Sequence, residues 1–571
     1  MILAAKNGII KVAQKDKAVF QKQLVRSKNK EENEMKKRIL AALLAVVMLF
    51  GLVACSKPAA SVPVSQEDAE ATKPVVEAEV VEKEVSKAEE GEALNYKKDI
   101  IISISQANVS VGPQDVNSGT QRVMGLMQFN RLTVFDPTTK ELVGELAEKF
   151  ESAESGKVWT FYLKQGILFQ NGEELKADDC VYTWERAKEF GKNTAAWAGT
   201  IEKCEALDDY TVRYTLSAPN MDFGFAMSDF NSSILNRKAN EEDPENGYAI
   251  GTNGWKIKEF VANDYVTYER FDDSFVWQEE GMNPTETITI KYMADQNARM
   301  IGVQAGDLDL GWGANNAEYY NYEEMEGVEP VVAASWSCDY VGMNANCEYF
   351  KDENVRKAVA YAINKDEALE IICNGFGLTC KSFWCPDAIG YTENFTENYS
   401  YNLEKAKEYM AKSAYPDGFS CTLTTISGYS LYAETVQSQL AAIGIDCQVE
   451  LTDSPGMNAG GQAGDFEMYI WNSTMSPYGN YLNQVLTTGG VNNFAHFSNE
   501  KIDQLMVEAL AEADTAKRAQ LYEQVQEEIN NDCYLVPMFF GYLSYLTQEN
   551  LEGYRFTPTG NFMYNVRAIV E

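Results

Sequence analysis

Residues 158–184 read VWTFYLKQGILFQNGEELKADDCVYTW and carry the pattern of one complete strand–turn–helix unit. Within it, Trp159–Lys164 alternates apolar and polar residues, as a half-buried strand requires. The dipeptide Asn171-Gly172 is typical of a tight turn, and Asp178 or Asp179 can cap the helix that follows. This stretch therefore predicts a strand that leads through a turn into a helix, as in an α/β protein.

The same alternation of strands and helices extends over most of the chain, and no repeat of 20–50 residues is visible. We therefore predict an α/β protein with two or more lobes and a ligand held between them. Further strands are expected at Ile100–Ile104, Trp255–Phe260, Tyr265–Glu269, Ile288–Tyr292, Cys447–Leu451, Phe466–Trp471 and Tyr534–Met538. Helices are expected at Gln296–Ala305, Glu434–Ile443 and Thr515–Asn530, after a capping box made by Asn364 with Glu367, and after a cap at Ser498.

The N-terminal region carries the pattern of an export signal. Lys36–Arg38 is basic, Ile39–Val53 is uncharged and apolar, and the small Ala54 precedes Cys55. The apolar run is shorter than the roughly 20 residues of a membrane-spanning helix, and the order of its parts is that of a secretory signal peptide. The ending resembles a bacterial lipobox, in which the cysteine is lipidated and becomes the mature N-terminus. A plain signal peptide or a short anchor with a chance cysteine is the alternative.

Two flanking segments complete this reading. Residues 1–34 are polar and lysine-rich, which is foreign to a signal peptide, so we expect Met35 to be the true start and 1–34 to be a mis-called extension. Residues 35–54 are then the signal peptide. Residues 55–97 contain the lipidated cysteine and an Ala-, Val-, Pro- and Glu-rich spacer, which predicts a solvated tether to the membrane.

Composition excludes several classes of function. The net charge of −36 disfavours a nucleic-acid partner, because phosphate contact needs clustered Lys and Arg. His496 is the single histidine, which leaves no room for most nucleophilic triads or for a histidine-rich metal site. The acid pairs Asp178-Asp179 and Asp272-Asp273 fall at predicted caps and turns, and nothing marks a catalytic pair. We expect a protein that is not an enzyme and that holds no metal or cofactor.

The cysteines leave two alternatives open. The chain has 11 cysteines and no CxxC pair, so a zinc site is disfavoured. Cys180, Cys421 and Cys447 occupy apolar positions of predicted elements, where a free thiol behaves as a small hydrophobe. Disulfides are also compatible with an exported protein. The candidates for pairing are Cys338 with Cys347, and Cys373, Cys380 and Cys385 among themselves.

Over 98–571 the chain resembles the family 5 extracellular solute-binding proteins, the oligopeptide and dipeptide receptors of ATP-binding-cassette (ABC) importers. The most specific part is Leu146–Val181, which is similar to the family pattern LAExW, TFxLRxGVxFHDG and TAxDVxF. Further matches follow in order along the chain. They are Asp295–Asp309, Val355–Lys365, Ile443–Ile445 and Ser498–Asp503.

The resemblance implies a two-lobed, hinged fold of the periplasmic-binding-protein type, with an extra domain inserted into a discontinuous first lobe. The first lobe would comprise 98–130, 247–335 and 530–571, the inserted subdomain 131–246, and the second lobe 336–529. It also implies a monomeric, membrane-tethered receptor that captures a small solute, most simply a peptide, and presents its closed form to ABC permease subunits. Closure follows because ligand makes more contacts with the closed than with the open arrangement.

Two departures from the family pattern bear on the ligand. Peptide binders commonly carry an aspartate in a W-x-x-D-x-x-D-P-like stretch, which pairs with the peptide's α-ammonium; Trp471–Pro477 reads WNSTMSP, one residue shorter and without a carboxylate. A buried ammonium without a counter-charge is costly. Either another acid substitutes, with Asp339 as the candidate, or the ligand has no free amino terminus. The family's G-T-G-P-Y also becomes GTNGW at Gly251–Trp255, which adds an aromatic residue.

The expected ligand surface follows from these departures. Neutral polar groups beside tryptophan suit a hydroxyl-rich ligand, so an oligosaccharide or another neutral solute is the alternative to a peptide. A surface sensor on the same scaffold is a third possibility, and an exported hydrolase is disfavoured. The candidate ligand-binding residues are Trp471, Asn472, Ser473, Thr474, Trp255 and Asp339.

Overall fold

The computed structural model describes residues 80–86, 94–106, 110–115, 119–136, 138–190, 194, 197–474, 479–558 and 560–570. Cys55, the predicted signal peptide, the predicted extension at 1–34 and most of the predicted tether lie outside these ranges. The described residues all fall within the compact unit Pro74–Glu571.

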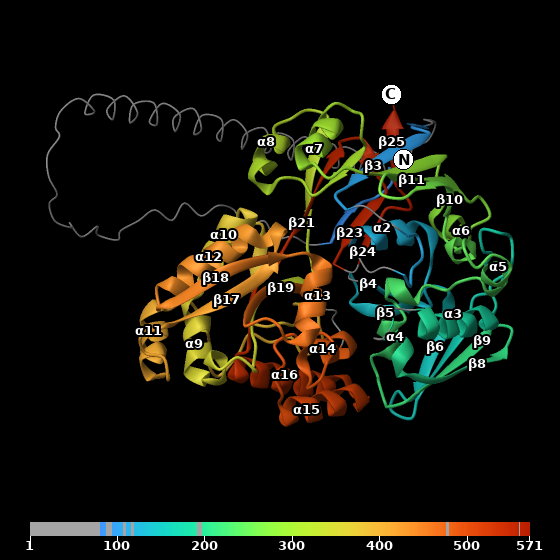
Figure 1. Ribbon diagram of the computed structural model, residues 1–571. Helices are drawn as coiled ribbons and strands as arrows, with labels where there is room; N and C mark the ends of the chain where they lie inside the picture. Colours follow the sequence, from blue (N-terminus) through green and yellow to red (C-terminus); the bar gives the residue numbers. More distant parts are fainter. Residues whose placement is uncertain are drawn as a thin grey trace, which may run out of the picture. The chain divides into compact units, whose positions relative to one another are not determined.

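The first lobe is built on a seven-stranded sheet assembled from distant parts of the chain (Figure 1). Its central strand β3 runs parallel to both of its neighbours, β12 and β13, and buries Ile100, Ile102 and Ile104. In spatial order the strands are β10 (Trp255–Val261), β11 (Tyr265–Arg270), β12 (Thr287–Tyr292), β3 (Asp99–Ile104), β13 (Leu310–Trp312), β21 (Leu543–Gln548) and β14 (Val328–Ala333).

Short helices and two small sheets surround this sheet. Helix α7 contacts β13 and β21, while α2 contacts β10. The helices are α2 (Gly119–Gln128), α6 (Val276–Glu280), α7 (Gln296–Gln304) and α8 (Tyr319–Glu323). The small sheets are β1 (Val81–Lys83), β23 (Tyr554–Thr557) and β24 (Gly560–Phe562), and β2 (Asn95–Tyr96), β25 (Arg567–Val570) and β22 (Leu551–Glu552).

The second lobe has a six-stranded sheet with its own helices. In spatial order its strands are β16 (Gly377–Thr379), β20 (Leu535–Gly541), β15 (Ser337–Met343), β19 (Met468–Thr474), β17 (Phe419–Ile426) and β18 (Ile445–Thr452). Its helices are α9 (Glu353–Ala362), α10 (Lys365–Cys373), α11 (Leu403–Lys412), α12 (Ser430–Ala441), α13 (Ser454–Ala463), α14 (Gly479–Leu486), α15 (Glu500–Ala511) and α16 (Thr515–Asp532).

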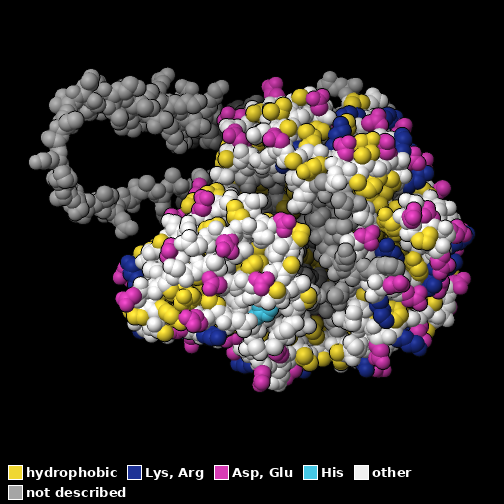
Figure 2. Space-filling model, in the orientation of Figure 1, with side chains coloured by type: hydrophobic (Ala, Val, Ile, Leu, Met, Phe, Trp, Pro, Cys, Tyr) yellow, Lys and Arg dark blue, Asp and Glu magenta, His cyan; other side chains and the backbone are white. Residues whose placement is uncertain are grey.

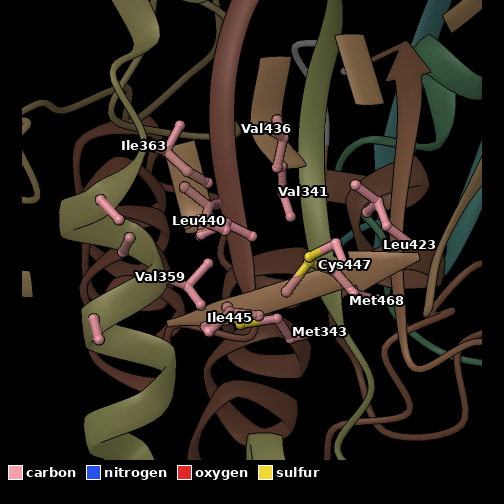
Figure 3. Close-up of a cluster of buried hydrophobic side chains, with 14 of the residues drawn as sticks. Val341, Met343, Val359, Ile363, Leu423, Val436, Leu440, Ile445, Cys447 and Met468 are labelled. Carbon is pink, nitrogen blue, oxygen red and sulfur yellow. The ribbon is translucent and has the colours of Figure 1, made fainter. Parts of the chain in front are cut away.

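The core of the second lobe forms where strands β15, β17, β18 and β19 meet helices α9 and α12 (Figure 3). These side chains are almost entirely shielded from solvent, and close packing of this kind contributes most of a domain's stability. The labelled members are Val341, Met343, Val359, Ile363, Leu423, Val436, Leu440, Ile445, Cys447 and Met468.

An inserted subdomain contains residues 158–184. Strand β7 spans Val158–Leu163 and lies between β6 (Ala147–Ala153) and β9 (Thr211–Leu216), with β8 (Ile201–Asp208) at the edge. Helix α3 (Ala177–Phe190) covers β8 and β9 and contacts α5 (Arg237–Glu242). The hairpin of β4 (Thr133–Asp136) and β5 (Glu141–Gly144) contacts β6 and helix α4 (Phe223–Ala226). Helix α3 begins at Ala177, before Asp178 and Asp179, the two residues expected to cap it. The Asp179 carboxylate instead lies within the first turn, where it accepts a hydrogen bond from the Lys176 backbone N–H (2.9 Å).

Two neighbouring connections join the two large sheets. Strand β14 leads into β15 through residues 334–336, and β20 leads into β21 through Tyr542. On one side β14 pairs with β21, and on the other β15 pairs with β20. The chain therefore returns to the first lobe at Tyr542, after β20 has completed the second sheet, whereas the sequence placed that boundary at residue 530.

Candidate functional site

Strands β15 and β19 bring two predicted site segments side by side. In their antiparallel register Asp339 lies opposite Asn472, and Tyr340 lies opposite Trp471. Directly opposite residues share a face of the sheet, and successive residues alternate between faces. The side chains of Asp339 and Asn472 therefore lie on one face, and those of Tyr340 and Trp471 on the other.

Asp339 is a half-buried carboxylate with an incomplete set of partners. Its Oδ1 atom is buried and has no hydrogen-bond partner. Among the described residues, no Lys or Arg lies within ion-pair distance of it. Burial raises the pKa of Asp339 to about 7, against a smaller opposing effect of a hydrogen bond with the Tyr429 hydroxyl. The site thus holds an acid that a cationic group would stabilise as the carboxylate.

A short polar chain leads to this carboxylate. The Asn472 amide Nδ2 donates to the Tyr429 hydroxyl, which in turn hydrogen-bonds with Asp339. Tyr429 lies three residues past the end of β17, in a short turn of helix. Sequence reasoning missed Tyr429; the signal available was its position just past the carboxyl end of a strand, where ligand-binding side chains gather in α/β proteins.

Two other residues of the 471–474 segment, Trp471 and Ser473, lie on the opposite face of β19, while Thr474 shares the face of Asn472. Trp471 is half-buried and packs against the cluster that includes Tyr340 and Tyr469 on the opposite face. Ser473 is buried and Thr474 is exposed. Met475 to Pro477 lie outside the described residues. The four predicted neighbours are thus divided between the two faces of β19.

Trp255 lies in the core of the first lobe rather than at a ligand surface. Its side chain is 0% exposed, and its ring meets Trp277 edge-to-face at 6.1 Å. Its indole Nε1 donates to the Tyr564 carbonyl at 2.7 Å. With its polar atom satisfied and no exposed surface, Trp255 has nothing to offer a ligand in this structure, and we leave it out of the candidate site.

The two lobes touch close to Asp339. A Cβ at Gly541, the last residue of β20, would lie 3.9 Å from the Asp339 Oδ2 atom. The Asn316 amide of the first lobe donates to the Cys373 carbonyl of the second at 3.4 Å. The rings of Tyr319 and Phe376 also meet across this boundary, with centroids 5.0 Å apart. These contacts place Asp339 beside the connection between the lobes.

No group of three or more His, Cys, Asp or Glu side chains among the described residues is arranged to hold a metal ion. The His496 ring Nε2 lies 2.8 Å from the Gly461 carbonyl, a structural contact. Figure 2 shows acidic side chains scattered over the visible face, with His496 as an isolated cyan patch.

The amino-acid sequence of this chain matches one known protein family. Residues 141–493 match the family described as bacterial extracellular solute-binding proteins, family 5 Middle. This chain is a family 5 solute-binding protein. Its family is one of substrate-binding proteins rather than enzymes, and its members work outside the cytoplasm. Across the described ranges, we find no helix long and apolar enough to cross a bilayer.

Individual relatives of this family 5 protein bind different solutes. The glutathione-binding protein GsiB of Escherichia coli strain K12 is 25% identical over 490 residues, which cover 82% of this chain and 94% of GsiB. The periplasmic binding protein DppA of Helicobacter pylori, solved with the peptide STSA, is 23% identical with a TM-score of 0.73, covering 83% of this chain and 99% of DppA. AgaA of A. tumefaciens R10, solved with agropinic acid, is 23% identical with a TM-score of 0.71, covering 83% and 99%.

Proposed function

We propose that this family 5 protein is the membrane-tethered receptor of an ABC importer, and that it captures a small peptide-like solute between its lobes and delivers it to a permease. The family match and the paired strand connections at residues 334–336 and Tyr542 support this role. Two adjacent connections allow one lobe to rotate against the other while both sheets stay intact. Ligand that contacts both lobes then shifts the equilibrium toward the closed form.

One observation carries the assignment of ligand type: among the residues that the structure describes, one buried oxygen of the Asp339 carboxylate has no hydrogen-bond partner and no Lys or Arg lies within ion-pair distance. Leaving a charge buried and unpaired is costly, so an ammonium group on the ligand would supply the missing partner. The amino terminus of a peptide or of a glutathione-like solute has this chemistry. Asn472 and Tyr429 would hold the carboxylate in place.

A neutral, hydroxyl-rich solute is the second candidate, and Trp471 favours it. Its ring is half-buried, so part of it is available for stacking, and no acid lies in residues 471–474. The two candidates use opposite faces of β19, which makes them separable by mutation.

The proposed tether rests on the sequence at Cys55, which we infer to be diacylated and to begin the mature chain. A Cys55→Ala variant should lose incorporation of labelled fatty acid and appear in the culture medium or the soluble extracytoplasmic fraction. Retention of the label in this variant would refute the lipidation site.

A thermal-shift screen with free peptides, N-acetylated peptides and oligosaccharides tests the ligand. A ligand present at 100 times its dissociation constant should stabilise the protein by about 2.7 kcal/mol. We expect free peptides to act, acetylated ones to fail, and Asp339→Asn to abolish the effect. Asp446→Asn, at an exposed position in the same sheet, is the matched control. Equal responses to free and acetylated peptides would exclude Asp339 as an ammonium site, and a response to oligosaccharides alone would favour the second candidate.

A further inference from the structure

A small cavity in the second lobe is lined by two lysines and, among the described residues, by no acid. It lies where the ends of α9, α10 and α16 meet β20 and the segment 381–384. Its volume is about 20 Å³, enough for one occupant about the size of a water molecule. The cavity belongs to neither the Asp339 site nor the boundary between the lobes.

Lys365 supplies the cavity's positive charge. Its ammonium Nζ donates to the Cys380 carbonyl at 2.9 Å, the one hydrogen bond it makes among the described residues. No described carboxylate lies within ion-pair distance of it. An ammonium group has three donors and no acceptor, so two of its donors lack a partner within the part of the chain that the structure describes. Burial lowers the pKa of Lys365, which shows that the fold itself does little to stabilise the charge.

A second unpartnered donor belongs to the same cavity lining. Trp384 is 1% exposed, and its indole Nε1 has no hydrogen-bond partner. An indole N–H can donate but cannot accept. Buried donors of this kind are nearly always satisfied, by ordered solvent or a ligand where protein groups do not suffice.

Two thiols near Lys365, those of Cys533 and Cys338, do not provide a negative charge. Cys533 lines the cavity and Cys338 lies close to Lys365. Burial raises the pKa of Cys533 to about 12 and that of Cys338 well above its ordinary value. Both are therefore neutral thiols near pH 7.

We propose that this cavity binds one halide ion, held by the Lys365 ammonium and the Trp384 indole N–H. A halide accepts hydrogen bonds from every side and donates none, which matches a lining with spare donors. It also provides the negative charge that the lysine lacks, and its size suits the small volume. Chloride is the halide that would occupy the site in an aqueous extracellular medium.

Crystals of the full chain grown in sodium bromide test the proposal directly. We expect one anomalous peak within hydrogen-bond distance of both Lys365 Nζ and Trp384 Nε1. Bromide is the probe in this experiment, so a separate signal from chloride is not required. An ordered water, or an empty cavity without anomalous signal, would overturn the proposal.

Thermal unfolding in solution gives an independent measurement. In sodium chloride the wild-type melting temperature should exceed that in sodium gluconate of equal ionic strength by about 2 °C. Lys365→Met and Trp384→Phe should lose this difference, while Lys381→Met, on the exposed rim of the same cavity, should keep it. An unchanged difference in Trp384→Phe and Lys365→Met would refute the site. If Lys365→Met fails to fold, Trp384→Phe and the bromide crystals still decide the question.

Discussion

The Tyr522 hydroxyl of α16 donates to the Asp222 carboxylate of the inserted subdomain at 2.7 Å, across 300 positions of sequence. Asp222 is 0% exposed, and the Arg518 guanidinium lies 3.7 Å from its other oxygen. The Met221 backbone N–H also donates to the Leu510 carbonyl at 2.7 Å. The inserted subdomain is thus fastened to the helices of the second lobe by a buried charged contact.

Removal of the Tyr522 hydroxyl should weaken this attachment. A hydrogen bond to a charged group contributes about 1.5–3 kcal/mol, and its loss leaves Asp222 less well compensated. We expect Tyr522→Phe to lower the unfolding free energy by that amount in a urea titration. Hydrogen exchange should increase around Met221. Tyr401→Phe, at a residue that is 50% exposed, should have little effect. Equal stability of the two variants would show that the contact is not energetically important.

The Asp339 carboxyl should make ligand affinity depend on pH. With its pKa raised to about 7, Asp339 is largely protonated below neutrality and charged above it. A cationic ligand pairs with the charged form, so its affinity should rise with pH through about 7 and then level off. Calorimetric titrations between pH 5 and 8 should show this rise in the wild type. The corresponding curve for Asp339→Asn should be flat and weak.

The same group has the opposite effect on the stability of the ligand-free protein. Because the folded-state pKa lies above the unfolded value of about 3.9, the folded state binds the proton more tightly. The contribution of Asp339 to stability is therefore present below pH 4 and is lost as pH rises through 7. Relative to Asp339→Asn, the wild type should lose unfolding free energy across this range. A constant difference between the two proteins would contradict the raised pKa.

The described cysteines should react as free thiols. None of them forms a disulfide, although the Sγ atoms of Cys421 and Cys447 lie 3.9 Å apart on paired strands, and those of Cys338 and Cys380 lie 3.7 Å apart. Most are buried, so iodoacetamide should modify them slowly in the native protein and fully in denaturant without reductant. A peptide linking Cys421 to Cys447 in the untreated protein would contradict this prediction.

Two glycines allow β17 and β18 to begin side by side. Gly418 has φ +85°, and a Cβ there would lie 2.0 Å from the Gly444 carbonyl oxygen. Gly418→Ala should therefore destabilise the protein by more than about 2 kcal/mol, through a strained backbone and displacement of the neighbouring strand. Gly428→Ala is the control, since its nearest neighbouring atom would be 4.0 Å away. Similar melting temperatures for the two variants would refute the close approach.

Local sequence signals predicted many elements of the fold correctly. Strand β7 spans Val158–Leu163 where 159–164 was expected, and α7 begins at Gln296 as expected. The Asn364 side chain accepts the Glu367 N–H at 3.2 Å, which confirms that helix start. Ser498 was one residue early, because Asn499 caps α15. Helix caps and strand patterns depend on residues that are close together in the sequence, so the sequence alone can predict them.

The site and the lobe boundary depend on information that the local pattern lacks. Asp339 meets Asn472 only because β19 inserts beside β15, and Tyr429 joins them from the short turn of helix that follows a third strand, β17. The sequence predicts that side chains alternate between the two faces of β19. It does not predict which face is exposed, because that depends on which face the helices pack against. Trp255 was misplaced for the same reason: an aromatic residue near a glycine-rich turn is apolar enough to be drawn into a core.

The paired connections between the lobes also constrain when the protein can fold. Strands β20 and β21 lie between residues 535 and 548, close to the C-terminus, yet each occupies an interior position in its sheet. Neither sheet can be completed until β20 and β21 have been synthesised. Strand β20 lies between β15 and β16, and β21 lies between β13 and β14, so each pairs with both of its neighbours. Long-range pairing of this kind slows folding. A nascent chain that cannot complete either lobe early stays unfolded. A protein that crosses a membrane before it folds needs to stay in that state.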